Sequence, residues 1–188
     1  MKLKFSTIAA GLLITGLAGC GSNHDTLRST YYSLGYTKGD ALLAANGQTI
    51  KVNVVTKQNQ TTLEETISSA LNQNGPKWLN AQYSPLTTTN NKSPYQMKWA
   101  FNVSEGGNAI SLCRESYSKT LESTSVDKGV VLAAFCVNNR TLTSLRARIH
   151  SEPGTKNFAK TVGLIGKKLL SATNPERSDD CKNFDDCS

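Results

Sequence analysis

The chain has 188 residues with a formal net charge of +7, and 38% of its residues are hydrophobic. This length excludes two large domains. The composition excludes a chain that is disordered throughout, because such chains combine few aliphatic residues with a high net charge. The composition therefore predicts one lean, soluble domain with its own hydrophobic core.

The N-terminus has the pattern of an export signal. Lys2 and Lys4 supply a positive start, and the apolar segment Ile8–Leu17 follows. That segment is too short to cross about 30 Å of hydrocarbon as a helix, which needs roughly 20 residues. We therefore predict a removable signal peptide over residues 1–19.

Residues 17–20 read Leu-Ala-Gly-Cys. This motif resembles the lipobox of the bacterial lipoprotein family. The resemblance implies cleavage before Cys20, a diacylglycerol on its thiol and a further acyl chain such as palmitate on its amine. Two or three acyl chains make a lasting membrane anchor. Because Gly21 rather than Asp follows, the family's sorting rule implies the outer membrane. The alternative is an ordinary secretory signal with a chance cysteine.

Four cysteines follow the signal: Cys113, Cys136, Cys181 and Cys187. An even number in an exported chain predicts two disulfides, with three connectivities open. We favour Cys113–Cys136, because both residues lie in apolar, strand-like segments, together with Cys181–Cys187. A metal site is the alternative, but Cys-x-x-Cys is absent and the two histidines lie far from either cysteine pair.

The expected organisation is a lipidated tether over 20–30, a periplasmic domain over 31–172 and an acidic, disulfide-stapled tail over 173–188. Residues 26–46 show no regular period. Hydrophobic periodicity beyond them predicts strands at 50–54, 95–101, 108–114, 129–138 and 142–150, and helices at 61–75 and 157–171. This order implies an α+β domain: a mainly antiparallel sheet with helices packed on one face.

Three short segments of the body, at 94–99, 111–113 and 133–136, are similar to small uncharacterised proteobacterial envelope proteins. The resemblance spans residues 48–171. It implies one domain and carries no known activity.

Positive charge is concentrated late in the chain. A candidate patch for an anionic partner consists of Arg146, Arg148, Lys156, Lys160 and Lys167. Lipid headgroups, lipopolysaccharide phosphates or an acidic protein would fit it, and a plain solvated face is the alternative. Nucleic acid is not expected as a partner of an exported, lipid-tethered domain.

The tail carries four carboxylates around its cysteines, at Asp179, Asp180, Asp185 and Asp186. They could hold calcium, but EF-hand spacing is absent and a solvated tail is the favoured interpretation.

Motifs for nucleophilic, metal or phosphate chemistry are missing from the sequence. His24 falls in the tether and His150 at a strand end. The row Tyr95, Trp99 and Phe101 alternates along one strand, which predicts core packing or, if exposed, a face for sugar rings. No catalytic residue, metal or cofactor is predicted.

These features favour a non-enzymatic, membrane-anchored lipoprotein that binds or assists an envelope assembly or secretion complex. Two alternatives stay open. One is an envelope enzyme acting on peptidoglycan or glycan, and the other is a small-ligand carrier with an apolar cavity between sheet and helices.

Overall fold

A computed structural model describes residues 24–46, 49–55, 60–88, 92–115, 117 and 129–177. Its centre is a six-stranded sheet of order β1-β6-β5-β4-β2-β3. The elements are β1 (Thr26–Tyr32), α1 (Lys38–Ala45), β2 (Thr49–Val55), α2 (Gln60–Asn74), β3 (Gln82–Pro85), η1 (Leu86–Thr88), β4 (Tyr95–Phe101), η2 (Ala109–Cys113), β5 (Val130–Val137), β6 (Arg140–Arg148) and α4 (Lys156–Leu169). The α+β class is confirmed: β1, β6, β5 and β4 pair antiparallel, and β2 runs parallel to β4 and β3.

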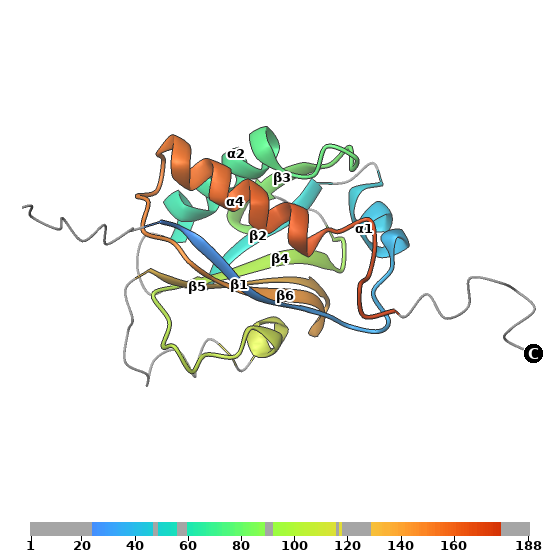
Figure 1. Cartoon of the computed structure of the whole chain (residues 1–188). Helices are drawn as coiled ribbons and strands as arrows, with labels where there is room; N and C mark the ends of the chain where they lie inside the picture. The colour runs from blue at the N-terminus through green and yellow to red at the C-terminus, as the bar shows by residue number, and fades with distance from the viewer. Residues whose placement is uncertain are drawn as a thin grey trace, which may run out of the picture.

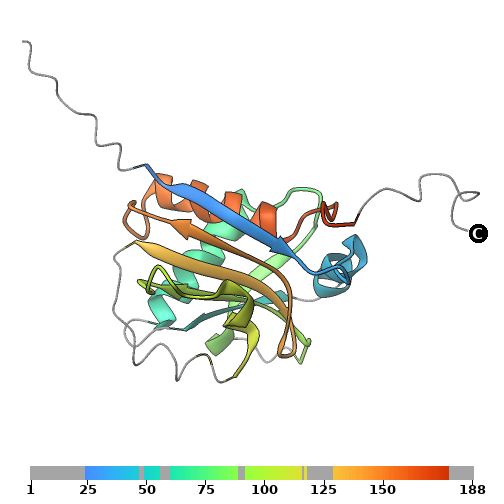
Figure 2. The ribbon, with the colours of Figure 1, turned by 60° about the horizontal axis from the view of Figure 1, so that its bottom comes forward.

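The helices α2 and α4 lie across one face of the sheet, and η2 covers part of the other (Figures 1 and 2). The main core lies under the helices, where α4 contributes Phe158, Val162, Ile165 and Leu169. A smaller core lies under η2 and includes Leu112, Leu132 and Ala134. β5 is buried on both faces because it contributes to both cores.

Two glycines of α4 allow the helices to approach closely. A Cβ atom at Gly163 would lie 2.4 Å from the Cβ of Asn74, and one at Gly166 would lie 2.5 Å from Cδ2 of Leu71. At Gly163 the backbone oxygen of Asn74 would also lie 2.6 Å from the added Cβ, so this position requires glycine, whereas at Gly166 the Leu71 side chain would have to shift. The close approach fixes α4 over the sheet and so sets where its exposed face lies.

The hairpin of β5 and β6 turns through the two residues Asn138 and Asn139, and Asn138 adopts a positive φ of 51°. Asparagine tolerates this left-handed conformation better than most residues. Of the aromatic row, Trp99 is fully buried in the core as predicted, whereas Tyr95 and Phe101 are partly buried and pack against the same core.

Two predicted boundaries and one element are corrected. The segment Thr26–Tyr32, assigned mostly to the tether, is strand β1 and pairs with β6. The predicted strand at 108–114 is the 3-10 helix η2, because the Asn108 side chain accepts a hydrogen bond from the backbone N–H of Ile110 at 2.9 Å. That local bond competes with an extended ladder.

The tail boundary at 173 also moves, because Asn174 belongs to the domain. Its side-chain amide donates to the carbonyl oxygens of Ser33 at 2.8 Å and Tyr36 at 3.1 Å.

The disulfide Cys113–Cys136 is confirmed, with its two Cα atoms 5.7 Å apart, and it joins η2 to β5. Cys20, the Cys181–Cys187 pair and the acidic residues of the tail lie outside the described residues.

Within the described residues, no helix has both the length and the apolar character needed to cross a membrane.

Candidate functional site

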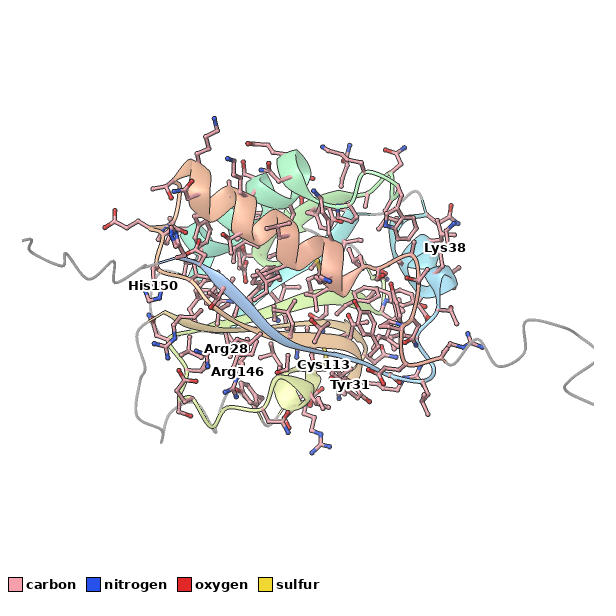
Figure 3. The ribbon with its side chains drawn as sticks, in the orientation of Figure 1. Arg28, Tyr31, Lys38, Cys113, Arg146 and His150 are labelled. Atoms are coloured by element: carbon pink, nitrogen blue, oxygen red, sulfur yellow. A yellow bond between two sulfur atoms is a disulfide. The ribbon has the colours of Figure 1, made fainter. Side chains whose placement is uncertain are left out.

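The predicted basic patch is divided by the sheet. In β6, Leu145 and Ala147 point into the core under the helices, so Arg146 and Arg148 point to the opposite face. The lysines of the patch are exposed on α4, on the helical side. The five residues therefore form two groups, and Figure 3 shows Arg146 beside the segment that contains η2.

Arg146 and Arg148 belong to a cluster that sequence reasoning missed. Together with Arg28 of β1 they surround the carboxylate of Glu105; we call these four residues the arginine cluster. Nη1 of Arg28 lies 3.8 Å and Nη1 of Arg146 3.6 Å from Oε2 of Glu105, and Arg148 pairs with Oε1. Three guanidinium groups face one carboxylate, so the cluster has a formal charge of +2.

Members of the cluster differ in exposure and in role. Arg146 is 23% exposed and also donates to the carbonyl oxygens of Glu105 and Gly107, so it holds the loop before η2 against the sheet. Arg28 is 52% exposed, and its 3.8 Å pairing with Glu105 is loose. An exposed ion pair of this kind contributes little to stability. Arg28 is therefore the member most available to a further anion.

A groove with a mixed polar and apolar lining adjoins the cluster. Its volume is about 480 Å³, and it is lined by Ser29, Thr30, Tyr31, residues 106–110, Ser144 and Arg146. β1 and β6 change register between Leu27 and Thr30, next to this groove. The lining offers hydroxyl, amide and guanidinium groups, which suits a polar ligand carrying negative charge.

Buried titratable groups support the loops around the cluster. Burial raises the pKa of the Tyr117 hydroxyl, and the nearby Arg146 opposes this shift. Burial lowers the pKa of Lys98, which Glu115 opposes, and the Lys98 ammonium donates to the carbonyl of Cys113 at 3.2 Å. These contacts are structural supports beneath η2.

Asp25 fixes the point where the chain enters the domain. Its carboxylate accepts hydrogen bonds from the backbone N–H groups of His150 and Ser151 and from the hydroxyls of Ser151 and Thr161. Burial acts to raise the pKa of Asp25, but these hydrogen bonds outweigh it and lower the pKa overall. The start of β1, the end of β6 and the first half of α4 are thus joined at one end of the molecule.

The opposite end of β1 leads to an apolar surface. Here we define the α1 surface as Leu34, Lys38, Leu42, Leu43 and Trp78. Leu34 is 73%, Leu43 59% and Leu42 46% exposed. The Lys38 ammonium lies 5.5 Å from the centre of the Trp78 ring, and Figure 3 places Lys38 at the far end from His150.

α1 is packed with its small residues inward. Ala41 and Ala44 are fully buried, whereas Leu42 and Leu43 point to solvent. A helix stabilised only by its own domain would bury the larger side chains, because each buried leucine contributes about 1.5–3 kcal/mol. A shallow cavity of about 370 Å³ beside the leucines is lined by α1 residues together with Leu79 and Asn80.

A third hollow lies between the sheet and the helices, where the carrier alternative expects a cavity. Its volume is about 450 Å³. Its apolar lining consists of Leu63, Phe101, Val131, Ile149, Pro153 and Phe158, and its polar lining includes Thr62, Thr66, Asn102 and Ser151.

Glu64 is the one fully buried acidic side chain within the described residues. Its carboxylate accepts hydrogen bonds from Val54 N–H at 3.1 Å, Gln60 Nε2 at 2.9 Å and the Thr87 hydroxyl at 3.2 Å. These bonds join α2 to β2 and η1, so Glu64 has a structural role. Among all the residues that the structure describes, no group of three or more His, Cys, Asp or Glu side chains is arranged to hold a metal ion.

Comparison with known proteins gives structural likeness only. No protein-family model matches the chain, and no curated protein matches it. Two solved structures, both PelC dodecamers from Paraburkholderia phytofirmans and one of them a point variant, are similar at 12% sequence identity with TM-scores of 0.39 and 0.38. They cover 79% and 80% of this chain and 99% of each PelC chain.

Proposed function

We propose that this protein is a membrane-anchored envelope lipoprotein whose domain binds a partner protein through the α1 surface. The lipobox at residues 17–20 supports the anchor, and the Cys113–Cys136 disulfide supports an oxidising compartment such as the periplasm. No enzymatic activity is part of the proposal.

The observation that carries the proposal is the orientation of α1. Leu42 and Leu43 contribute nothing to the domain's core while smaller alanines do. Exposed apolar surface rimmed by polar residues is typical of protein–protein interaction sites. A partner that covers the two leucines would supply the burial that the domain itself does not.

The chemistry of the rim defines the partner. Lys38 lies over Trp78, and Lys77 is exposed next to Trp78 in the chain. A fitting partner surface has an apolar centre for the leucines and acidic residues at its edge for the two ammonium groups. Aromatic residues such as Trp78 are enriched among the strongest contributors to binding.

Site-specific photo-crosslinking in the native host tests this proposal. A photoreactive amino acid at position 43 should give one defined crosslinked species in membranes, identified by mass spectrometry. Position 164 is the matched control, because Leu164 on α4 is 50% exposed but lies outside the α1 surface. Equal crosslinking patterns at positions 43 and 164 would contradict the proposal.

The anchor is tested separately. Cys20→Ala should release the protein from the membrane fraction, and an unchanged membrane fraction would contradict the anchor without bearing on the α1 surface.

A small-ligand carrier is the second candidate, supported by the 450 Å³ hollow lined by Phe101 and Phe158. Native mass spectrometry of protein purified from its host should then show a bound small molecule. A mass equal to that of the processed, acylated protein alone would count against this candidate.

A further inference from the structure

The arginine cluster lies where the chain enters the domain. Arg148 pairs in register with Thr26, the first residue of β1, and Arg28 lies two residues further along β1. Asp25, the residue before β1, is held by Ser151 and Thr161. The cluster therefore has a fixed position relative to the point from which the N-terminal segment leaves.

The distance from this point to the predicted lipid site is short. Thr26 follows Cys20 by six residues, and six residues span at most about 20 Å when fully extended. A cluster tied this closely to an acylated cysteine meets the membrane surface at high effective concentration.

We propose that the arginine cluster binds the phosphate of an anionic membrane lipid and so orients the domain on the membrane that holds its anchor. This inference rests on the anchor of the proposed function and extends it with a specific ligand class. The α1 surface, at the other end of β1, then points away from the membrane.

The excess of cations supports a phosphate ligand. Glu105 supplies one carboxylate to three guanidinium groups, and Arg28 and Arg148 are 52% and 33% exposed. The guanidinium fork matches phosphate oxygens in a two-pronged geometry, which Lys does not offer.

Holding the loop accounts for only part of the cluster. Arg146 fixes the loop through the carbonyl oxygens of Glu105 and Gly107. Arg28 makes neither of these bonds, and its looser contact at 3.8 Å adds little to the fold. A lipid contact explains why a third, half-exposed arginine, Arg28, lies at this point.

One neighbouring feature fits the same ligand, and a second, on the other face of the sheet, fits the same anionic membrane. The groove beside Arg146, about 480 Å³ in volume, has room for the glycerol or sugar part of a headgroup and offers the hydroxyls of Ser29 and Thr30. On the other face, Lys156 and Lys160 are exposed in the first half of α4, which begins at the same end of the molecule (Figure 1). Lys167 lies about 17 Å from Lys156 along the helix axis.

Arginine footprinting with phenylglyoxal tests the contact on the lipidated protein itself. The protein is reconstituted in two kinds of vesicle, one of phosphatidylcholine alone and one that also contains about 30% phosphatidylglycerol. Labelling at each arginine is then measured by mass spectrometry. Arg177 is the internal control, because it is exposed and its N–H bonds to Asn174, which is itself bonded to Ser33 and Tyr36 beyond the far end of β1. We expect labelling of Arg28 to be about fivefold slower on the anionic vesicles, while Arg177 is unchanged.

Three further arms separate the sources of phosphate and the two proposals. Inorganic phosphate added to the phosphatidylcholine vesicles should not slow labelling of Arg28; equal protection by free phosphate would overturn the lipid assignment. Equal labelling of Arg28 on both vesicle types would overturn the contact itself. Flotation of the vesicles reports the anchor independently, so protein that does not float identifies a failure of the anchor instead.

A conservative variant adds a second readout. Arg28→Gln removes one charge and leaves the Arg146 contacts that hold the loop. On anionic vesicles, this variant should lose most of the protection of Arg148, and full protection of Arg148 would contradict a shared ligand.

Discussion

The two ends of β1 present opposite kinds of surface. At its start, the exposed side chains are cationic and already engaged: Arg28, Arg146 and Arg148 share Glu105. At its far end, the exposed side chains are apolar, and Leu42 and Leu43 have no place in the core. The fold holds the three arginines of the first surface in place around Glu105. At the second surface, the fold leaves the side chains of Leu42 and Leu43 uncovered. A domain with these two ends can bind a charged membrane and an apolar partner at the same time.

The disulfide should have the largest effect, and its local consequences should fall on the face of the sheet that carries η2. Replacing both Cys113 and Cys136 by Ala removes a link between residues 23 apart in sequence, which costs about 3 kcal/mol of unfolding free energy. Urea unfolding should report this loss. Because η2 follows the loop held by Arg146, phenylglyoxal labelling of Arg146 should rise, whereas radical labelling of Leu43 should stay constant. A loss below about 1 kcal/mol would contradict a structural role for this link.

Paired substitutions in α1 should give the next largest effect. Ala41→Leu forces a larger side chain into a fully buried position and should lower the unfolding free energy by about 1–3 kcal/mol. Leu42→Ala, at an exposed position, should change it by less than about 0.5 kcal/mol while weakening partner crosslinking. Thermal unfolding of both variants measures the difference. Equal destabilisation would mean that Leu42 serves the fold and not a partner.

The pH dependence at Asp25 should be the smallest effect. The folded state lowers the pKa of Asp25, so its contribution to stability is present above the ordinary value near 3.8 and is lost as the pH falls through the folded pKa. The difference in unfolding free energy between the native chain and Asp25→Asn should therefore shrink below pH 4. A constant difference between pH 7 and pH 3 would contradict this.

The sequence predicts much of the sheet and its helices, because their patterns are local. β2, β4, β5 and β6 have alternating or continuous apolar residues, and α2 and α4 have a helical apolar stripe. The pairing of Cys113 with Cys136 is confirmed, but only one of the two strand-like settings predicted for it is right, because Cys136 lies in a strand and Cys113 lies in the 3-10 helix η2.

Other elements could not be predicted because they depend on distant contacts. β1 has few apolar residues and forms by pairing with β6, more than 100 residues later. α1 shows no amphipathic period because its leucines point outward. The arginine cluster joins positions 28, 105, 146 and 148, which only the strand order and the loop before η2 bring together.

Hydroxyl-radical footprinting of the lipidated protein tests the two-ended account most directly, because it reads Arg28 and Leu43 in the same sample. One sample holds the protein in its native envelope, and the other holds it in vesicles that contain phosphatidylglycerol and no other protein. The account predicts that Arg28 is protected in both samples and that Leu43 is protected only in the native envelope. Protection of Leu43 in the pure lipid vesicles, or exposure of Leu43 in the native envelope, would contradict it.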